Sequence, residues 1–528
     1  MLKVRESLRD HLVICVILTV FASIYLTLPL SLQACEVYDY AAAIEKYYRN
    51  SVGFALSQGF DLPDFGRYHP NHPLGHVLAA GAYDFLSIPA MTWLKFSNVT
   101  GAIMAGIFLY LLQLQMKIFK TLSAAAVAFF LGTYCGLFTV LSGEWHMPAL
   151  ALSLGSYWQF VKYSENRLVR HLYIASVLFS AAVCYHLAAF FYVVPLTIAM
   201  LVCNYKKREY QTFLISGLIV AIPMLLVYVI VPFIIFSFQS FEEFKRTFFA
   251  YKYLSHARYD GLDWLVMAAR TIYHSFVYSF ATNNLIHVLS LFFMIVIALT
   301  SWAFCYLRFA RIQSFLVVGT PIWWIGAHWV MGARPDALLG WLFALPFLCI
   351  VFIQILSRIR LAGRFLAYSI PFGALLWNIY AAILPNSMSR PENVSFVSMP
   401  KNLDSNTPIA FVISHPILTQ LEIWHTGSKL GFRNQTHFMP CCGENNFFAR
   451  LKRWTSQNPG FVIIADGRYD AIENFLAAQK TPYKRWLDVR ADWPSRLVPT
   501  TLFVQDKAAP FYRKSLAIWV PTAVLMRE

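Results

Sequence analysis

The chain has 528 residues, of which 58% are hydrophobic, 17% aromatic and only 13% charged, and its formal net charge is +16. This composition excludes an ordinary soluble globule and predicts a protein that lives in a lipid bilayer. The positive charge does not require a nucleic-acid partner, because 16 of the basic residues lie in the short segments predicted to be cytoplasmic.

Segments long enough to cross a hydrocarbon core of about 30 Å recur along the chain, each free of Asp, Glu, Lys and Arg. They are 11–33, 98–116, 121–143, 145–161, 172–205, 210–241, 271–307, 312–333, 337–357 and 365–389. The window 172–205 is too long for one span and carries Tyr185 and His186 near its middle. It therefore predicts two short helices joined by a tight turn, and about eleven transmembrane helices in all.

Basic residues give an independent check on this count, because short cytoplasmic loops collect Lys and Arg. Eleven spans threaded from a cytoplasmic N-terminus place every short basic cluster on one side: Lys3/Arg5/Arg9, Lys117/Lys120, Lys162/Arg167/Arg170, Lys206/Lys207/Arg208, Arg308/Arg311 and Arg358/Arg360/Arg364. A single span at 172–205 would put the later clusters on the opposite face. We therefore expect a multi-pass protein, of a bacterial inner membrane, whose external regions are 34–97, the turn at Glu144, 242–270 and the chain after about residue 385.

The first external segment has acidic residues directly after the first span. Glu36, Asp39 and Ala43 recur at spacings of three and four, so on a helix they would share one face near the membrane surface. Carboxylates at that depth are costly unless they are solvated or used. A polar helix N-terminus favoured by the helix dipole and a functional pair of carboxylates both remain open.

Residues 68–76 read YHPNHPLGH and contain three histidines. Pro73 favours the start of a helix, with His72 at or near its cap and His76 one turn in. A spacing of four can bind a metal ion from one helical face, but the HExxH pattern is absent. Packing or hydrogen bonding at the membrane interface is therefore preferred to metal ligation for these residues.

Together these features resemble the C-type membrane glycosyltransferases, or GT-C fold. The resemblance lies in an acidic residue at the outer end of the first span, an aromatic and Ala-rich helix, a loop with Tyr-His-Pro and a second proline, and a following helix along the membrane. The family includes protein mannosyltransferases and lipid A aminoarabinose transferases. The resemblance implies a polyprenyl-phosphate-linked sugar donor, a glycan, lipid or protein acceptor, contact with membrane lipids and no nucleic acid.

The resemblance also implies a catalytic base in the first external loop. Cys35-Glu36 stands where the family frequently has Asp-Glu, so Glu36 and Asp39 are rival candidates, with Glu36 slightly preferred. A divalent cation is the one cofactor considered, because some family members require one. Its candidate ligands are Glu36, Asp39, Glu144 and His72.

The expected substrate-binding residues lie on the same external side. In the first loop they are His69 and His72, and in LSGEWHMPALALSLG they are Glu144 and His146. Arg334 in GARPDALLGWLFALP is the first choice for the donor phosphate, because guanidinium and phosphate form strong charge-assisted contacts. Lys252 and Arg258, interleaved with aromatic residues in 242–270, suit a helix in the headgroup region.

After the last predicted span the composition changes. Residues 390–528 alternate apolar strands such as IAFVIS and GFVIIAD with helical stretches such as YDAIENFLAAQK. This pattern predicts an external soluble α/β domain that follows a GT-C-like transmembrane domain at 1–389. A transporter or flippase is the alternative function, but such proteins place ionisable residues near the bilayer midplane and often show internal repeats, and neither is found here.

Overall fold

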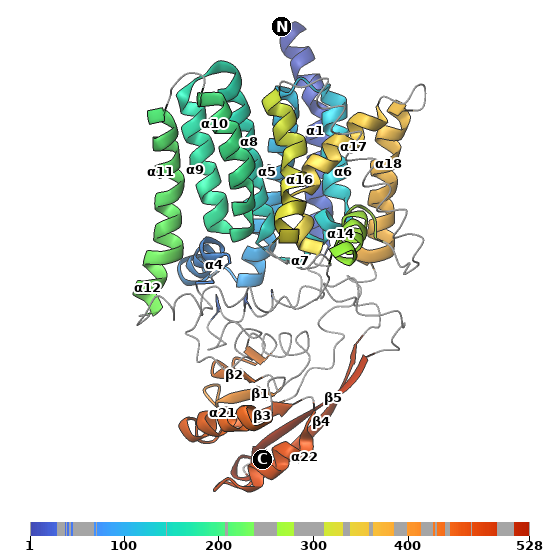
Figure 1. Ribbon diagram of the computed structural model, residues 1–528. Helices are drawn as coiled ribbons and strands as arrows, with labels where there is room; N and C mark the ends of the chain where they lie inside the picture. The colour runs from blue at the N-terminus through green and yellow to red at the C-terminus, as the bar shows by residue number, and fades with distance from the viewer. Residues whose placement is uncertain are drawn as a thin grey trace.

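A computed structural model of the chain shows a bundle of helices with an α/β unit at one end, and the N-terminus lies at the opposite end of the bundle (Figure 1). The structure describes residues 2–28, 37, 40–41, 44–45, 68–69, 71–143, 145–205, 210–236, 261–278, 311–330, 338–357, 363–384, 399–412, 426–427, 430–438, 444–465, 467–493 and 512–526.

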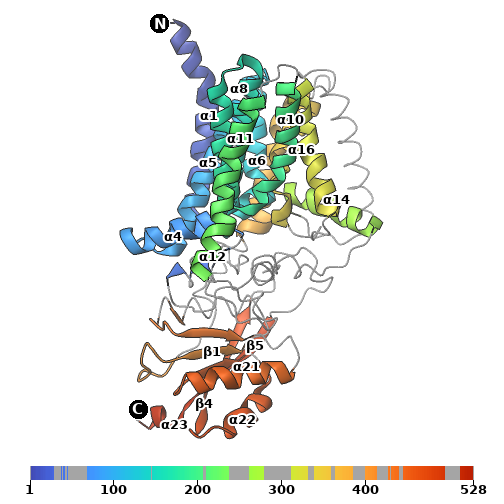
Figure 2. The same cartoon turned by 60° about the vertical axis from the view of Figure 1, so that its left-hand side comes forward.

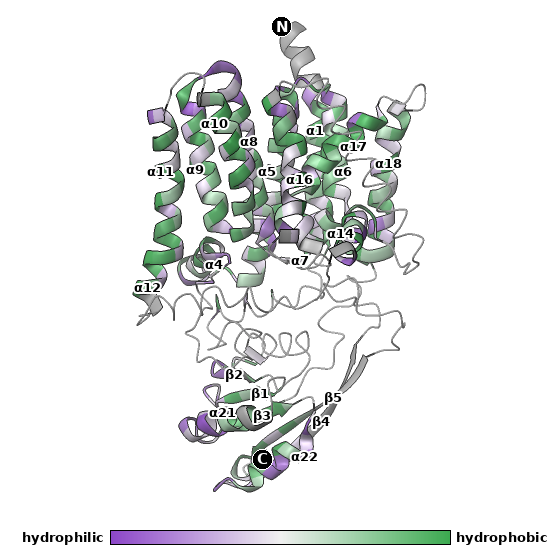
Figure 3. Ribbon diagram, viewed as in Figure 1, coloured by the Kyte–Doolittle hydropathy of each residue, from purple (hydrophilic) through white to green (hydrophobic). Residues whose placement is uncertain are grey.

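The described helices of the bundle are α1 (Leu2–Thr27), α4 (Pro73–Leu86), α5 (Ala90–Gln115), α6 (Lys120–Gly132), α7 (Tyr134–Ser142), α8 (His146–Asn166), α9 (Val169–Tyr185), η1 (Leu187–Tyr192), α10 (Val193–Tyr205), α11 (Tyr210–Leu225), η2 (Leu226–Ile230), α12 (Val231–Phe236), α14 (Gly261–Phe276), α16 (Arg311–Val330), η4 (Leu338–Trp341), α17 (Leu345–Leu356), α18 (Gly363–Asn378) and η5 (Ile379–Ile383). Apolar residues dominate their length, as Figure 3 shows.

Within the described residues, three helices are long and apolar enough to cross a membrane: Ala90–Gln115, Tyr210–Ile234 and Phe365–Ile383. The pair α6 and α7 makes a fourth if it is counted as one span, and there are shorter apolar helices at His11–Thr27, Val169–Tyr185, Leu187–Cys203 and Leu345–Leu356. The predicted total of eleven spans therefore stays a prediction.

The predicted external loop 34–97 ends earlier than expected, because α5 begins at Ala90. Because Lys95 is charged, the first turns of α5 lie outside the charge-free window 98–116. Its ammonium group donates to the carbonyl oxygens of Leu26 (2.8 Å) and Leu28 (2.9 Å) at the end of α1. A lysine at a helix C-terminus satisfies carbonyl groups that have no partner in the helix, so it stays compatible with an apolar helix.

The predicted break in the window 172–205 is present. Helix α9 ends at Tyr185, His186 has an extended backbone, and η1 leads into α10. The Leu187 amide donates to the Asn71 carbonyl oxygen (2.7 Å) and so leaves the helical ladder. The Val183 carbonyl oxygen, which that amide would bond in a continuing helix, accepts instead from the Tyr228 hydroxyl (2.6 Å).

The helix that follows widens into a π-turn before it ends. In η2 the Val231 amide bonds the Leu226 carbonyl oxygen, five residues back, and Pro232 next in the chain has no amide proton. The carbonyl of Val227 is therefore left without a donor from its own helix. The Tyr68 hydroxyl donates to this oxygen, which fixes the loop that precedes α4 against α11 and α12.

The predicted span 121–143 is two helices, α6 and α7, bent by 56°. Helix α6 ends at Gly132, and the Thr133 side chain caps α7 by accepting from the Gly136 amide (3.1 Å). Asn378 on α18 donates to the Gly132 carbonyl (3.0 Å) and the Phe276 carbonyl (2.9 Å), and accepts from the Tyr278 amide (2.8 Å). One buried amide side chain thus joins the α6–α7 bend to the end of α14.

Two helices lie across the end of the bundle that faces the α/β unit (Figure 2): α4 and α14. Helix α4 begins at Pro73 with His72 as its N-cap, as the sequence predicted. Helix α14 runs through the boundary predicted between the loop 242–270 and the window 271–307. Residues 271–276 therefore belong to a crosswise helix and not to the start of a span.

The α/β unit has a five-stranded sheet in the order β2-β1-β3-β5-β4. Its strands are β1 (Ile409–Val412), β2 (Gln435–Phe438), β3 (Val462–Ala465), β4 (Tyr483–Trp493) and β5 (Tyr512–Pro521), and its helices are α21 (Glu444–Gln457), α22 (Tyr469–Ala477) and α23 (Thr522–Leu525). Strand β1 is parallel to β2 and β3, whereas β5 is antiparallel to β3 and β4. Buried side chains of α21 and α22 pack on the sheet as a core of their own.

Candidate functional site: a buried histidine cluster

Three histidines from the YHPNHPLGH stretch form a compact group. His69 stacks on His72 with ring centroids 4.0 Å apart, and the His76 ring lies 5.1 Å from His72 and 5.2 Å from His69. One ring nitrogen of each lies within 4.8 Å of the other two. The side chains of these residues, which we call the histidine triad, are all buried, with at most 5% exposed.

The local backbone explains why the three rings meet. The His72 amide donates to the His69 carbonyl (3.3 Å) and closes a turn, and the His76 amide donates to the His72 carbonyl (3.2 Å) as the first bond of α4. Residues four apart on a helix lie on one face, so the first turn of α4 fixes His72 and His76. The turn then brings His69 over them.

Aromatic side chains enclose the histidine triad. The Tyr40 ring makes edge contacts with His69 (5.4 Å), His72 (5.0 Å) and His76 (5.0 Å). On α4 itself, Gly75 faces Trp145, because a Cβ built there would lie 2.7 Å from a ring atom of that tryptophan. The absence of a side chain at Gly75 thus lets the indole approach α4.

Two more histidines extend the group. The rings of His146 and His186 lie 4.0 Å apart, and His186 lies 5.3 Å from His72. His186 accepts a hydrogen bond at Nδ1 from the Ala188 amide (3.0 Å), which caps η1. His146 begins α8, so the cluster joins the first loop, the start of α8 and the break between α9 and α10.

Burial affects the protonation of two triad members, His69 and His72. It lowers the pKa of His69 and of His72 well below the usual 6.5, and the neighbouring histidines lower both further. The rings are therefore neutral at neutral pH, and each carries one nitrogen lone pair. No hydrogen-bond partner among the described residues reaches His72 Nδ1. A buried nitrogen in that condition costs free energy unless a ligand or ion meets it.

Glu45 is a carboxylate in the same region that the sequence pattern did not single out. Its side chain is 9% exposed, and its Oε1 accepts from the amide of Ala90, the first residue of α5 (2.7 Å). Burial raises its pKa, and the hydrogen bond from Ala90 opposes that rise. A carboxylate at a helix N-terminus is favoured by the helix dipole, so Glu45 fastens the segment that precedes α4 to α5.

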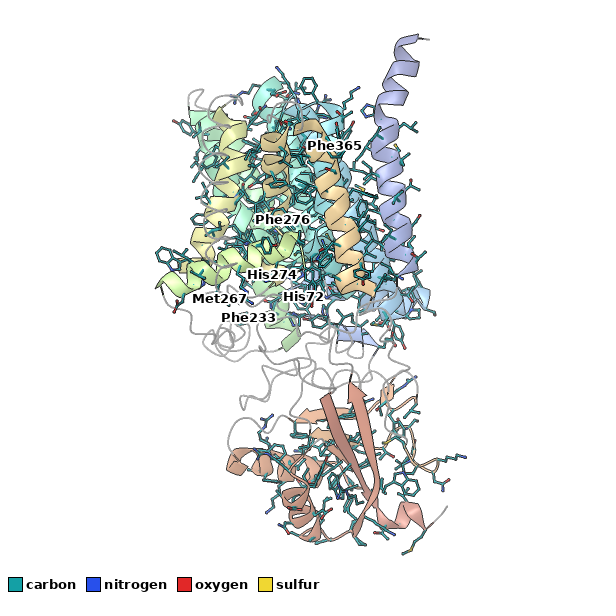
Figure 4. The ribbon with its side chains drawn as sticks, turned by 90° about the vertical axis from the view of Figure 1, so that its right-hand side faces the viewer. His72, Phe233, Met267, His274, Phe276 and Phe365 are labelled. Carbon is teal, nitrogen blue, oxygen red and sulfur yellow. The ribbon has the colours of Figure 1, made fainter. Side chains whose placement is uncertain are left out.

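Helix α14 contributes a buried cation. Arg270 is 8% exposed and His274, one turn further on, is 1% exposed. Figure 4 places His274 and His72 at the same end of the bundle, the end that faces the α/β unit. An arginine is rarely buried to this degree without a polar or charged partner. Arg270 does interact with other groups of the protein, so its burial alone does not mark an anion site.

The structure describes only some of the predicted site residues. His69 and His72 lie together, and His146 joins them through His186. The remaining candidates lie outside the described residues: Glu36, Asp39, Glu144, Arg334, Lys252 and Arg258. Tyr40, which follows Asp39 in the sequence, contacts all three triad rings.

Two members of the cluster outside the predicted site carry a signal in the sequence. His76 lies one turn from His72 at the start of α4. His186 marked the break in an apolar window, where a polar residue needs a partner. Tyr40 and Trp145 had no such signal, because aromatic residues are abundant throughout the chain.

No family model and no curated protein matches this sequence. Solved structures do match. ArnT from Cupriavidus metallidurans bound to undecaprenyl phosphate aligns with a TM-score of 0.56 and 10% identity, over 96% of this chain and 97% of ArnT. ArnT in the apo state aligns over the same shares with a TM-score of 0.52 and 10% identity. This chain has the GT-C fold.

The GT-C fold confirms the predicted class, a polytopic helical membrane protein. The oligosaccharyltransferase of Archaeoglobus fulgidus aligns less closely, with a TM-score of 0.46 and 12% identity over 87% of this chain and 69% of its own. At these identities the likeness establishes the fold and leaves the reaction to be argued from the site.

Proposed function

We propose that this chain is a membrane glycosyltransferase that moves a sugar from a polyprenyl-phosphate donor to an acceptor hydroxyl on the external face. The observation that carries the proposal is the alignment, over nearly the whole length of both chains, with ArnT bound to undecaprenyl phosphate. A site at the end of the bundle where α4 and α14 lie crosswise (Figure 2) suits a donor whose lipid tail stays in the bilayer.

The proposed chemistry is a single displacement with inversion. A carboxylate, Glu36 or Asp39, takes the proton from the acceptor hydroxyl as its oxygen attacks the anomeric carbon. The bond between that carbon and the phosphate oxygen breaks, and polyprenyl phosphate leaves with the electron pair. A general base typically contributes about 10²- to 10⁴-fold to such a step, and placement of the reactants supplies much of the rest.

The donor phosphate needs cations near the external interface. Arg334, Lys252 and Arg258 are the proposed partners, taken from the sequence. An arginine binds phosphate through two parallel hydrogen bonds, which fixes the orientation of the group as well as its charge. His69, His72, Glu144 and His146 are proposed to line the substrate pocket nearby.

A donor panel tests the activity. Purified full-length protein is incubated with polyprenyl-phosphate sugars and candidate acceptors, and mass spectrometry follows release of free polyprenyl phosphate. We expect turnover of at least one donor, lost in Glu36→Gln or in Asp39→Asn. Full activity in both variants would exclude a carboxylate base at these positions. Folded protein that moves lipid-linked sugar across vesicles without releasing polyprenyl phosphate would instead indicate the flippase.

A matched control comes from the other end of the bundle. Glu165 on α8 accepts hydrogen bonds from Gln115 and Gln313, and α8 reaches it at the end opposite His146. Glu165→Gln removes the same charge as Glu36→Gln at a position away from the proposed site. We expect this variant to keep donor turnover, so that loss in Glu36→Gln or Asp39→Asn reports on the site.

A further inference from the structure

The histidine triad has the residue types of a metal-binding site, and its ring nitrogens lie close together. Its ring nitrogens lie within 4.8 Å of one another, and within the described residues no carboxylate or cysteine joins this group. We propose that His69, His72 and His76 bind one transition-metal ion of the Zn²⁺ class. This inference goes beyond the proposed sugar transfer, since an ion can be bound whether or not the chain turns over a donor.

The ring spacing supports a shared ion. Imidazoles that bind one tetrahedral ion through bonds of about 2 Å have centroids roughly 5 Å apart. The His72–His76 distance of 5.1 Å and the His69–His76 distance of 5.2 Å agree with that spacing. The ring centroids of the stacked His69–His72 pair, 4.0 Å apart, are closer together than this spacing. His72 and His76 thus already have this centroid spacing, although their stacked rings (19° between planes) must tilt to point at one ion, and His69 must turn its ring to complete the set.

That turn has an identifiable cost. His69 Nδ1 accepts a hydrogen bond from the Asn71 amide (3.2 Å), which is long for such a bond. An ion bound at Nδ1 takes the lone pair that accepts this hydrogen bond. An ion bound at Nε2 leaves the ring proton on Nδ1, which then can no longer accept. A single weak hydrogen bond is worth about 1 kcal/mol. The binding free energy of an ion in a small zinc site is far larger than the loss of this one bond.

The donor set selects the class of ion. Neutral imidazole suits Zn²⁺, Cu²⁺, Fe²⁺ and Ni²⁺, whereas Mg²⁺, Ca²⁺ and Mn²⁺ prefer oxygen ligands. A neutral imidazole binds an ion through the lone pair of one ring nitrogen. An ion would also satisfy His72 Nδ1, which no described residue reaches. Three protein ligands leave a fourth position of a tetrahedral ion for an oxygen ligand.

Metal content is the direct test. Full-length protein is purified in detergent with an affinity tag that contains no histidine, and bound metal is measured by mass spectrometry. The metal is then stripped with a chelator, and Co²⁺ is titrated back while its visible spectrum is followed. We expect about one ion per chain and the intense absorption of a tetrahedral Co²⁺ site. A wild-type protein with no bound metal and no such spectrum would overturn the proposal.

Variants locate the ion. We expect His72→Ala and His76→Ala to weaken Co²⁺ affinity by at least about tenfold, the lower limit seen when only a supporting residue is lost. His171→Ala is the matched control, because His171 lies on α9 and bonds Gln159, outside the cluster. Equal Co²⁺ affinity in all three variants and the wild type would contradict the assignment. If a triad variant fails to fold, the wild-type titration still decides, and neither measurement involves donor or acceptor.

Discussion

Gly75 is the residue at which packing around the triad can be tested most simply. A Cβ there would lie 2.7 Å from Trp145, whereas one at Gly81, on the same helix, would meet nothing within 4 Å. We expect Gly75→Ala to destabilise the protein by about 1–3 kcal/mol, the usual range for overpacking. Gly81→Ala should be neutral or slightly stabilising. Thermal unfolding in detergent separates the two, and equal midpoints would contradict the packing described here.

The tyrosine hydroxyls give a second test at this scale. The Tyr228 hydroxyl satisfies the Val183 carbonyl at the end of α9, where the next amide has left the ladder. Tyr228→Phe leaves that carbonyl without its donor, which typically costs about 1–3 kcal/mol. Tyr210→Phe on the exposed surface of α11 is the control. An unchanged unfolding midpoint for Tyr228→Phe would show that water or lipid headgroups satisfy this carbonyl equally well.

Protonation of the triad predicts a pH dependence of stability. The folded-state pKa of His69 and His72 lies well below 6.5, chiefly through burial. The unfolded chain therefore binds protons first as the pH falls, so stability that is full above about pH 6.5 is lost below it. We expect the thermal unfolding midpoint of the metal-free protein to decrease as the pH is lowered from about 7 to about 5. The decrease should be smaller in His72→Asn. Parallel pH curves for the two proteins would refute this origin.

At the scale of elements, the bundle is built from helices that end or widen inside it, and side chains from elsewhere satisfy the freed backbone groups. Tyr68, Tyr228 and Asn378 each serve a carbonyl at a different break. Unpaired backbone groups are expensive in a bilayer, so these contacts are what make the breaks tolerable. The breaks at α9 and α11 hold the loop before α4, and hence the triad, in place.

The hydrogen bonds of Asn378 are expected to hold the end of α14 in place. Asn378→Leu keeps the side-chain volume but removes the contacts to the Gly132 carbonyl, the Phe276 carbonyl and the Tyr278 amide. Loss of a buried polar partner costs about 1–3 kcal/mol per group, so we expect a marked fall in the unfolding midpoint. We also expect faster hydrogen exchange in 261–278. Gly373→Ala on the same helix, where nothing lies within 4 Å, is the control; an equal response would contradict the role of Asn378.

Some elements could be predicted from the sequence and others could not. Pro73 and His72 marked the start of α4, and His186 marked a break, because prolines and polar residues in apolar windows have few alternatives. The bend after Gly132 carried no such mark, since its partner Asn378 lies 246 positions away. The predicted start of α5 was too late because Lys95 interrupts the apolar window. Its ammonium group bonds carbonyl oxygens at the end of α1, a contact that the local sequence does not reveal.

At the scale of the whole molecule, the α/β unit is proposed to be a separate external domain. Its buried residues form a core distinct from that of the bundle, which is the property that lets a domain fold alone. We expect a fragment of residues 390–528 to be soluble and cooperative in thermal unfolding. Circular dichroism of the fragment, with helix and strand signals lost in one transition, is the measurement. An aggregated or unfolded fragment would show that the bundle is needed to fold it.

The candidate site also divides between what the sequence carried and what only the fold brings together. His69, His72 and His146 were predicted from their place beside the external ends of spans, and the fold collects them. His186 lies 114 residues beyond His72 in the sequence and meets it only because α9 breaks beside the first loop. Long-range contacts of this kind leave no local pattern.

We propose that this protein, which has the GT-C fold, transfers sugar from a lipid phosphate. The most direct measurement is the release of free polyprenyl phosphate by purified full-length protein, followed by mass spectrometry with donor and acceptor present. We expect one polyprenyl phosphate to be released for each glycosylated acceptor formed. This release should be abolished by Glu36→Gln or Asp39→Asn and kept in Glu165→Gln. Folded protein that releases no polyprenyl phosphate from any donor, with any acceptor, would contradict it.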